Sequence, residues 1–385
     1  MKAGWEVKKL GEVCTVIAGQ SPEGKFYNNA GDGLPFYQGK KEFTEKYIGK
    51  PTTWTTYVTK EAEKDDVLMS VRAPVGPVNF STEKICIGRG LAAIRSSKII
   101  DKNFLFNFLL KHEAEIVGNS GAVFDSVNKK QIESILIPVP PIHEQERIVA
   151  ILDQAFVGIA KARANAEQNL RNARTLFESH LQNIFSQGDE FVALSELATD
   201  ITDGDHMPPP KTTNGIPFIT ISNVNKQTRL IDFSDTFTVD HDYYNNLKPN
   251  RKPQKGDVLY TVTGSYGIPV IVDFELEFCF QRHIGLIRPN RNTNSQWLYY
   301  LLLSPSVFQQ ASDGATGTAQ KTVSLKVLRN IKVPQMSSTK QQEIVRTLDA
   351  LAKETQRLET LYQHKITLLD ELKKSLLQQA FAGEL

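Results

Sequence analysis

The chain has 385 residues, of which 40% are hydrophobic and 23% charged, a composition typical of folded globular proteins and not of disordered or fibrous ones. This length predicts two or three domains. The net charge of +2 excludes a strongly basic, histone-like protein, and no apolar stretch approaches the roughly 20 residues that span a bilayer.

The N-terminal segment and the cysteines indicate the cellular compartment. The lysines Lys2, Lys8 and Lys9 are not followed by an apolar segment, so we expect no secretory signal, no membrane association and a cytoplasmic location. Three cysteines, Cys14, Cys86 and Cys279, lie far apart and form no C-x-x-C pair. We therefore expect neither a disulfide framework nor a zinc site, but three buried thiols.

Residues 1–141 are rich in Gly, Pro, Thr and aromatic residues and contain short alternating apolar runs, which predict a mostly β domain with one or two short helices. Gly19–Lys25 satisfies the first seven positions of G-x-x-x-x-G-K-[ST], but the eighth is Phe26, which has no hydroxyl for Mg²⁺. We expect a polar loop there and not a nucleotide site. Of the acids Asp65 and Asp66, only Asp66 has a later counterpart, Asp257, which favours a turn residue over a catalytic pair.

Residues 142–187 contain no proline and no glycine except Gly158, and predict one long helix behind the rigid prolines Pro138, Pro140 and Pro141. Its apolar residues recur at alternating spacings of three and four, the pattern of a coiled coil. The alternative is a long helix that packs only on its own domain. The main seam positions are Ile148, Leu152, Ile159, Leu170 and Phe177.

The second half of the chain repeats the first. Four segments recur in the same order: Leu34–Tyr37 as Ile216–Ile219, Lys64–Val71 as Lys255–Val262, Arg89–Arg95 as Arg282–Arg288, and Gln145–Asp153 as Gln341–Asp349. The separation grows from 182 residues at Pro35 and Pro217 to 196 at Asp153 and Asp349, and it changes only in Gly-rich and polar segments, as loop insertions would produce. The sequence therefore predicts a tandem duplication of a two-part unit.

The duplication assigns the rest of the chain. Residues 188–337 are expected to form a second β-rich domain, and residues 338–385 a second long helix that starts behind Pro334. Two such repeats, related by a pseudo-two-fold axis, would pair their long helices antiparallel. The seam of the second helix is predicted at Ile344, Leu348, Leu351, Leu358, Leu369 and Leu376, with Tyr362 and Leu372 between them.

Sequence motifs for catalysis are missing. The chain contains no H-E-x-x-H, no G-x-S-x-G and no glycine fingerprint for a dinucleotide, and its seven histidines are scattered. A chain that devotes its length to duplication and spacer helices is expected to recognise or assemble other molecules, and to do no chemistry itself.

The layout of domain, long helix, domain and long helix resembles the specificity (S) subunit of type I restriction–modification enzymes. The segments that carry the resemblance are Ile137–Asp153, the loop Gly314–Lys321 and the C-terminal Leu376–Leu385. The first copy departs from that loop, because it has Gly121–Ser126 in its place.

The resemblance implies an α+β fold with two β-rich target recognition domains joined by two long antiparallel coiled-coil helices. It also implies a non-catalytic subunit of a phage-defence system that recognises a split sequence in double-stranded DNA, one half with each domain. The helices would bind two adenine-N6-methylating (M) subunits, and motor-nuclease (R) subunits would join for cleavage. Cofactors are expected on the partners, which would hold S-adenosylmethionine, ATP and Mg²⁺, and none on this chain.

The duplication also separates candidate DNA contacts by type. Cations present in both copies, Arg89 with Arg282 and Arg95 with Arg288, are candidates for phosphate contacts, and the alternative is ordinary surface or ion-paired arginines. Polar residues that differ within matching loops are candidates for contacts to bases. In the first domain these are Gln20, Ser21, Lys25, Gln38, Lys40, Lys41, Arg72 and Asn79, and in the second they are His206, Lys211, Thr220, Ser222, Asn223, Thr263, Ser265, Tyr266, Thr318, Gln320 and Lys321.

The charge is not concentrated in either domain, since residues 1–141 carry +3 and residues 188–337 carry −1. Any DNA-facing patch of cations must therefore be local, and tight binding is expected to need partner subunits. Three alternatives remain at this point: a specificity subunit of a fused methyltransferase-nuclease or another phage-defence system, a coiled-coil adaptor with two protein-binding domains, and a stand-alone enzyme.

Overall fold

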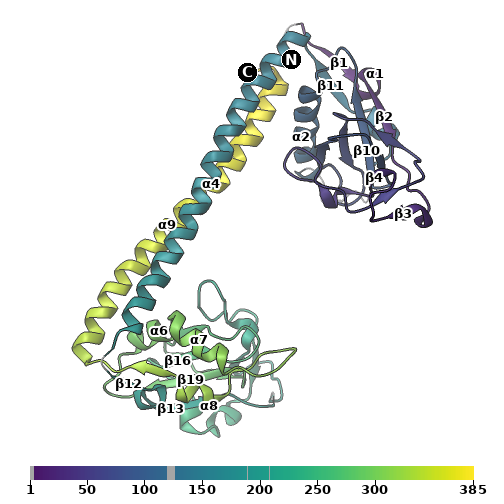
Figure 1. The fold of residues 1–385 in the computed structure, drawn as a ribbon. Helices are drawn as coiled ribbons and strands as arrows, with labels where there is room; N and C mark the ends of the chain where they lie inside the picture. Colours follow the sequence, from purple (N-terminus) through teal and green to yellow (C-terminus); the bar gives the residue numbers. More distant parts are fainter. Residues whose placement is uncertain (1–3, 119–125, 189, 208) are drawn as a thin grey trace. The chain divides into compact units, whose positions relative to one another are not determined.

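A computed structural model describes residues 4–118, 126–188, 190–207 and 209–385, and they divide into two compact units (Figure 1). Unit 1 joins Met1–Glu167 to His364–Leu385, and unit 2 is the continuous stretch Gln168–Gln363. Each unit contains a β-rich domain and a part of both long helices, α4 (Ile142–Ser186) and α9 (Ser338–Ala382).

In unit 1 the described strands form a two-stranded ladder β1-β11, a sheet with the order β2-β10-β7-β8, and a sheet with the order β3-β5-β4-β9-β6. The bounds are β1 (Glu6–Lys9), α1 (Leu10–Val13), β2 (Cys14–Ala18), β3 (Tyr27–Asn28), β4 (Leu34–Tyr37), β5 (Trp54–Thr55), β6 (Glu61–Ala62), β7 (Val67–Ser70), β8 (Val78–Phe80), β9 (Ile85–Ile87), β10 (Leu91–Ser96), α2 (Lys102–Gly118), α3 (Lys129–Glu133) and β11 (Leu136–Val139).

Unit 2 has the ladder β12-β20 and the sheets β13-β19-β16-β17 and β15-β14-β18. The bounds are β12 (Phe191–Ala193), β13 (Ala198–Asp203), β14 (Ile216–Ile219), β15 (Phe237–Val239), α5 (His241–Asn245), β16 (Val258–Thr261), β17 (Pro269–Ile271), β18 (Cys279–Phe280), β19 (Ile284–Pro289), α6 (Ser295–Leu303), α7 (Pro305–Asp313), α8 (Leu325–Asn330) and β20 (Lys332–Pro334).

The two units share the two-stranded ladder and the four-stranded sheet strand for strand, which confirms the predicted tandem repeat, whereas their remaining sheets have five and three strands. In unit 1 strand β10 pairs antiparallel with β2 and β7, and in unit 2 strand β19 pairs in the same way with β13 and β16. In both, one parallel ladder joins two strands that are distant in sequence, β4 with β9 and β14 with β18. The corresponding residues even share their register, since Ile94 faces Val67 and Ile287 faces Val258.

The hydrophobic core of each domain includes one end of each long helix. In unit 1 the buried Phe104, Leu105 and Leu109 of α2 lie in one cluster with Ile148 and Leu152 of α4, and Leu377, Ala380 and Phe381 of α9 complete this cluster. In unit 2 the cluster around Trp297 and Leu301 of α6 includes Leu181 and Phe185 of α4 together with Ile344 and Leu348 of α9. Neither domain therefore buries its core without the helices.

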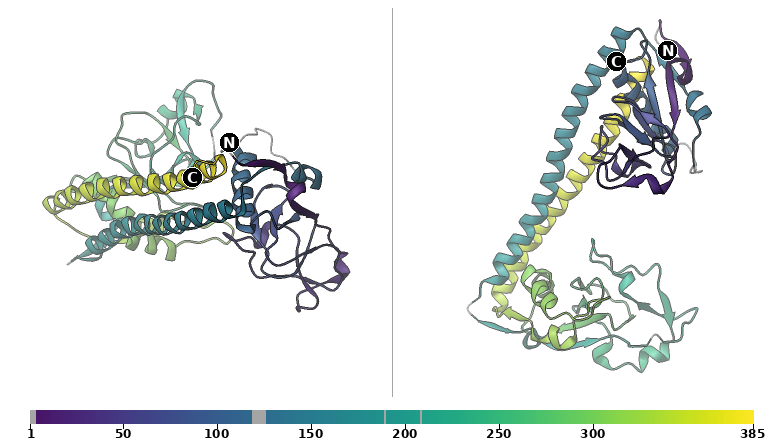
Figure 2. Two further views of the ribbon diagram at one scale, coloured as in Figure 1. Left: turned by 90° about the horizontal axis from the view of Figure 1, so that it is seen from above. Right: turned by 45° about the vertical axis from the view of Figure 1, so that its right-hand side comes forward.

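The helices α4 and α9 lie side by side and antiparallel within each unit (Figures 1 and 2). In unit 1 the guanidinium of Arg163 pairs with Asp370. In unit 2 Nε of Arg174 lies 3.2 Å from a carboxylate oxygen of Glu359. As the residue number rises along α4, the number of its partner on α9 falls, which is the antiparallel pairing that the duplication predicts.

The seam between these helices differs in part from the predicted one. Of the predicted residues, Ile148, Leu152, Ile159, Ile344 and Leu348 are buried, whereas Leu170, Phe177, Leu351, Leu358, Leu369 and Leu376 are half-buried. Leu372 was wrongly assigned to the seam, because its side chain is 47% exposed. Thr355 and Ile366 are buried, although the predicted seam left them out. Thr355 lies four residues after Leu351 and three before Leu358, and Ile366 lies four residues after Tyr362 and three before Leu369, so both fit the seam spacing.

Within the described part of the chain, no helix is both long and apolar enough to cross a membrane. The three cysteines are buried and free, as the sequence predicts.

Candidate nucleic-acid interface

Four predicted residues of unit 1 meet where β2, β4 and β9 end. The hydroxyl of Ser21 donates a hydrogen bond to Oε1 of Gln38 (2.9 Å) and accepts one from the backbone N–H of Arg89 (3.2 Å). Gln20 joins the group through its backbone N–H, which donates to Ile87 O (3.0 Å). The side chains of Gln20, Gln38 and Arg89 are exposed and that of Ser21 is half-buried. We define Gln20, Ser21, Gln38 and Arg89 as the unit 1 cluster.

Glycines allow the three chain segments of the unit 1 cluster to approach so closely. A Cβ on Gly19 would lie 2.1 Å from Gly88 O, and one on Gly90 would lie 2.4 Å from Gln38 O. A side chain at either position would therefore separate the segments. The sequence between Gly19 and Lys25, which partly resembles a phosphate-binding loop, continues into a short 3-10 turn at Gly24–Phe26, and Lys25 pairs with Glu23.

Unit 2 has the same arrangement with different side chains. The backbone N–H of Arg282 donates to Asp205 O (3.0 Å), and that of Gln281 donates to Ile219 O, immediately before Thr220. Gly204 takes the place of Gly19, since a Cβ there would lie 1.9 Å from Phe280 O. The unit 2 cluster is therefore Asp205, His206, Thr220 and Arg282, and it retains an exposed arginine at the position of Arg89.

The acids of unit 2 are partly neutralised. Arg251 lies 3.4 Å from Asp203 and 3.6 Å from Asp205, and Nε2 of His206 lies 3.0 Å from Asp203. By contrast, no hydrogen bond or ion pair joins the guanidinium of Arg89 or Arg282 to another side chain in the described ranges. These two arginines are thus the cations that both clusters leave available to a ligand.

A second group of predicted residues assembles in unit 2 from two loops. Gly264 N–H donates to Lys321 O (3.0 Å), and Thr263 and Thr316 each form a bridge with Thr322. This pairing brings the exposed Ser265, Thr318, Gln320 and Lys321 to one edge, beside the half-buried Tyr266. Tyr266 stacks on Phe308 with 5.7 Å between ring centroids, and Gly267 permits this, because a Cβ there would meet the ring of Phe308 at 2.5 Å.

The corresponding place in unit 1 is only partly described. Arg72 is exposed and forms a bridge with Ser126, as Thr263 does with Thr322. The rest of the predicted loop, residues 121–125, lies outside the described residues.

Three predicted base contacts are wrong, because their side chains are buried in the domain. Asn79 is 1% exposed, and its amide donates to Thr44 O (2.9 Å) while its oxygen accepts from Thr44 N–H (2.8 Å). Asn223 is 6% exposed and joins Thr220 to Asp232 and Asp235. Thr263 is also buried. The sequence alone does not distinguish an asparagine whose amide hydrogen-bonds within a loop of its own domain from one whose amide faces a ligand.

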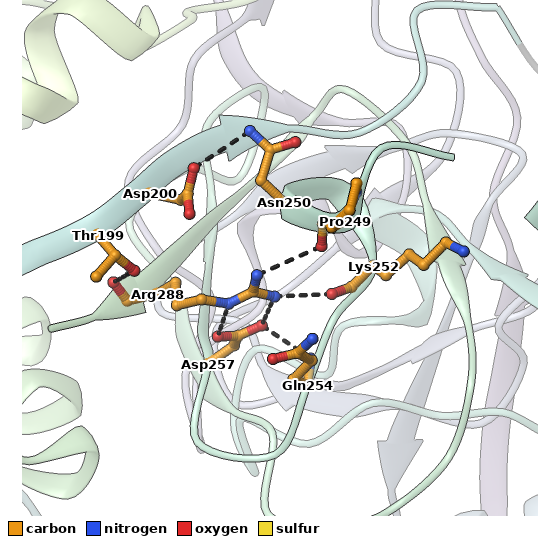
Figure 3. Close-up of polar contacts among 8 residues, drawn as sticks. All are labelled: Thr199, Asp200, Pro249, Asn250, Lys252, Gln254, Asp257 and Arg288. Carbon is orange, nitrogen blue, oxygen red and sulfur yellow. Dashed lines mark hydrogen bonds and ion pairs between the residues drawn. The ribbon is translucent and has the colours of Figure 1, made fainter. Parts of the chain in front are cut away.

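Arg95 and Arg288 are ion-paired arginines, the alternative to phosphate contacts, because each is bonded to the repeated aspartate of its own domain. Nε and Nη2 of Arg288 donate to the two oxygens of Asp257 at 2.9 and 2.8 Å, and Nη2 also donates to Lys252 O (Figure 3). Arg95 binds Asp66 in the same bidentate way, at 2.8 and 2.7 Å. The hydrogen bonds that Arg288 donates to Asp257 raise the pKa of Arg288 above its ordinary value.

The same aspartates confirm the predicted turn role. The carboxylate of Asp66 accepts from Glu63 N–H and that of Asp257 from Gln254 N–H, both at 2.8 Å. Each aspartate thus closes a turn and holds an arginine of the neighbouring strand. In neither unit is it placed as a catalytic group.

The remaining predicted residues are exposed, and of these Ser222 joins the unit 2 cluster, because its hydroxyl lies 2.7 Å from that of Thr220. Lys211 lies over the ring of Phe237 at 4.7 Å, and Lys25 lies over Phe26 at 5.1 Å. Lys40, Lys41 and Ser222 are exposed on short 3-10 turns or at their edges. Two exposed aromatic residues, Tyr57 and Phe308, are not among the predicted site residues. Tyr57 stacks on Phe26. The sequence did not single them out, because an aromatic residue in a polar loop or on a helix predicts packing more often than contact with a ligand.

Metal ligands do not gather in the described ranges, where no group of three or more His, Cys, Asp or Glu side chains could hold an ion. The unit 1 cluster offers amides, a hydroxyl and an arginine, and the unit 2 cluster adds a carboxylate and an imidazole, all of which can hydrogen-bond to nucleic acid.

The sequence matches the family described as "Type I restriction modification DNA specificity domain" twice, over residues 2–167 and 190–368. The chain belongs to this family. Its members are DNA-recognition subunits and not the catalytic subunits of restriction–modification systems. Each of the two family matches contains one cluster.

Relatives among type I specificity subunits include a putative MjaX specificity subunit of Methanocaldococcus jannaschii, which is 42% identical over 175 residues, 44% of this chain and 40% of that protein. The EcoBI specificity subunit of Escherichia coli is 21% identical over 417 residues, 99% of this chain and 86% of that protein.

Solved structures support the same fold. A chain from the work "Structural basis underlying complex assembly and conformational transition of the type I R-M system" superposes with a TM-score of 0.80 at 21% identity, and covers 100% of this chain and 99% of that one. The HsdS subunit of Thermoanaerobacter tengcongensis gives 0.59 at 21% identity, over 100% of this chain and 98% of that one.

Proposed function

We propose that this specificity subunit recognises a DNA target in two halves, one with each domain, and directs methylation and cleavage by partner subunits. The observation that carries the proposal is the repeated cluster. The same strand ends present Gln20, Ser21, Gln38 and Arg89 in unit 1, and Asp205, His206, Thr220 and Arg282 in unit 2. A shared arginine with divergent polar neighbours suits a common phosphate contact beside different base contacts.

The partners follow from the family and from charge. Two M subunits would bind the long helices, and R subunits would join for cleavage, with S-adenosylmethionine, ATP and Mg²⁺ bound by those partners. Neither domain has an excess of cations large enough for tight binding alone, since log Kd depends on the number of phosphates that are neutralised. The M subunits would add phosphate contacts, and the complex would work in the cytoplasm.

The test is a base-resolution map of N6-methyladenine in cells with and without this gene. We expect one methylated motif of two fixed halves separated by a fixed number of unspecified base pairs, present only with the gene. The complex assembled with M subunits should then bind this motif more tightly than a scrambled DNA. Absence of any gene-dependent motif, or equal affinity for both DNAs, would contradict the proposal and favour a protein-binding adaptor.

A substitution test shows whether the paired loops that carry Arg72 and Lys321 contact DNA. Lys321→Ala in unit 2 and Arg72→Ala in unit 1 each remove one exposed cation from paired loops. If these loops contact DNA, affinity of the assembled complex falls for each variant, and unchanged affinity would remove that residue from the interface.

A further inference from the structure

Gln145 lies in the first turn of α4 and is fully buried, although it is polar. Its Nε2 donates to Ile99 O (2.9 Å) and to Pro140 O (2.8 Å), and its Oε1 accepts from Asp101 N–H (2.8 Å). One side chain thus joins the start of the long helix, the residues before that helix and the start of α2. Asp101 in turn accepts from Phe104 N–H (2.9 Å) and caps α2.

Gln341 repeats this arrangement in unit 2, in the first turn of α9. Its Nε2 donates to Asn292 O (3.0 Å) and Met336 O (2.8 Å), and its Oε1 accepts from Asn294 N–H (2.8 Å). Gln341 is 1% exposed, and Asn294 caps α6 through Trp297 N–H (2.9 Å). Two unlike recognition domains therefore hold their long helices with the same three hydrogen bonds.

Other contacts between helix and domain are less directional or differ between the units. Apolar contacts of Ile148 and Ile344 add burial without fixing an angle. Two turns further on, Asp153 lies 3.5 Å from Lys46, whereas Asp349 accepts from the hydroxyl of Tyr300 (2.7 Å). Hydrogen bonds require narrow angles, so a buried amide with three partners is the contact that defines direction.

We propose that Gln145 and Gln341 are positioning residues that set the direction in which each long helix leaves its recognition domain. Through that direction they set the number of unrecognised base pairs between the two half-sites. This inference rests on the proposed function. A helix of 45 residues is roughly 65 Å long, so a change of about 5° at its base moves its far end by about 6 Å, more than the 3.4 Å rise of one base pair.

The test measures spacer selectivity in the complex assembled with M subunits. DNAs carry the two mapped half-sites separated by the native spacer or by one or two base pairs fewer or more. We expect the unsubstituted complex to favour the native spacer about tenfold over its neighbours, and Gln145→Leu or Gln341→Leu to reduce this preference to about threefold or less, with base preference inside each half-site unchanged. Gln154→Leu and Gln342→Leu, on exposed faces of the same helices, should leave the profile unchanged.

The outcomes separate this inference from the proposed function. If the unsubstituted complex binds no DNA, the proposed function fails. If it binds and the leucine variants keep the sharp spacer profile, the glutamines only stabilise the fold and the positioning role is wrong. Gln145→Glu should reduce the spacer preference in the same direction, because it keeps an acceptor for Asp101 N–H but places a carboxylate oxygen against the carbonyl oxygens of Ile99 and Pro140.

A distance measurement on the full chain does not depend on DNA. Spin labels at Lys98→Cys and Arg291→Cys, exposed positions after β10 and β19, report one distance between the domains. The native thiols are buried, and burial raises the pKa of Cys14 and of Cys279 to about 12, so labels go to the new cysteines. Gln145→Leu should broaden the distance distribution, and an unchanged width in a folded variant would overturn the inference.

Discussion

At the scale of single residues, the clusters place two kinds of candidate DNA contact side by side. Arg89 and Arg282 keep the same charge in two domains whose neighbouring side chains differ, as expected of contacts to the uniform phosphate backbone. Oε1 of Gln38 instead accepts a hydrogen bond from the hydroxyl of Ser21, which orients the side-chain amide. The second lone pair of Oε1 and the amide N–H groups remain for hydrogen bonds to a base. The two kinds of contact predict different behaviour on substitution.

Arg89→Ala should weaken binding of the assembled complex to every DNA by a similar factor. The slope of log K against log[salt] is negative, and loss of one phosphate contact reduces its magnitude by about 1. Titrations over a range of salt concentrations measure this slope. Lys98→Ala removes the same charge beyond the opposite end of β10 and should leave the slope unchanged. Equal slopes for the Arg89 variant and the unsubstituted complex would exclude a phosphate contact.

Gln38→Ala should relax base preference at one position of one half-site. A glutamine amide pairs in two places with adenine, and such a pair discriminates by about 1–3 kcal/mol. Binding to a library randomised in both half-sites measures the effect. Thr220→Ala, at the matching place in unit 2, should act on the other half-site. A Gln38 variant whose preference equals that of the unsubstituted complex would show that this amide does not contact a base.

At the scale of elements, the long helices form one seam whose members the sequence shows only in part. Ile366 is 7% exposed, although the predicted pattern passed over it, and its neighbour Leu368 is 48% exposed. The alternation of three and four, and not apolarity alone, decides which side chains face the partner helix.

Ile366→Ala should therefore lower the free energy of unfolding of unit 1 by about 2–4 kcal/mol, since it removes buried methyl and methylene groups from the seam. Leu368→Ala, which removes similar groups from an exposed position, should change it by less than about 1 kcal/mol. Denaturant unfolding of the full chain measures both. Similar losses for the two variants would contradict the observed seam.

Sequence reasoning succeeded for elements and failed for individual polar side chains, for a physical reason. Helix length, antiparallel pairing and repeated strands follow from proline positions, periodicity and duplication, which are local patterns. Whether Asn79 faces a ligand or Thr44, and whether Arg288 faces DNA or Asp257, depends on chain segments that meet only after folding. Gln145 and Gln341 were visible in the repeat, but nothing near them in sequence shows that both are buried.

At the scale of the whole molecule, the two units are built from different parts of the chain. Unit 2 is continuous, whereas the core of unit 1 is completed by Leu377, Ala380 and Phe381 near the C-terminus. The ring of Phe381 contacts Phe104 edge-on, with centroids 5.0 Å apart, and Phe108 at 5.4 Å. The last turns of α9 are thus part of the N-terminal domain.

Phe381→Ala should destabilise unit 1 by about 3–5 kcal/mol, the usual cost of removing a buried aromatic ring. Hydrogen exchange followed by mass spectrometry should show faster exchange in β10 and unchanged exchange in β16. Phe308→Ala, which removes a 45% exposed ring from unit 2, is the matched control and should leave β10 unchanged. Protection of β10 that survives the Phe381 substitution would show that the C-terminal residues are dispensable for this core.

The discontinuity of unit 1 also determines the order in which the newly made protein can fold. During synthesis, residues emerge from the ribosome in sequence order, and domains fold as their residues become available. All of unit 2, Gln168–Gln363, emerges before His364–Leu385, which unit 1 still requires. The domain that is translated first is therefore the last to complete its core, because Phe104 and Phe108 lack their contact with Phe381 until the last turns of α9 have been translated.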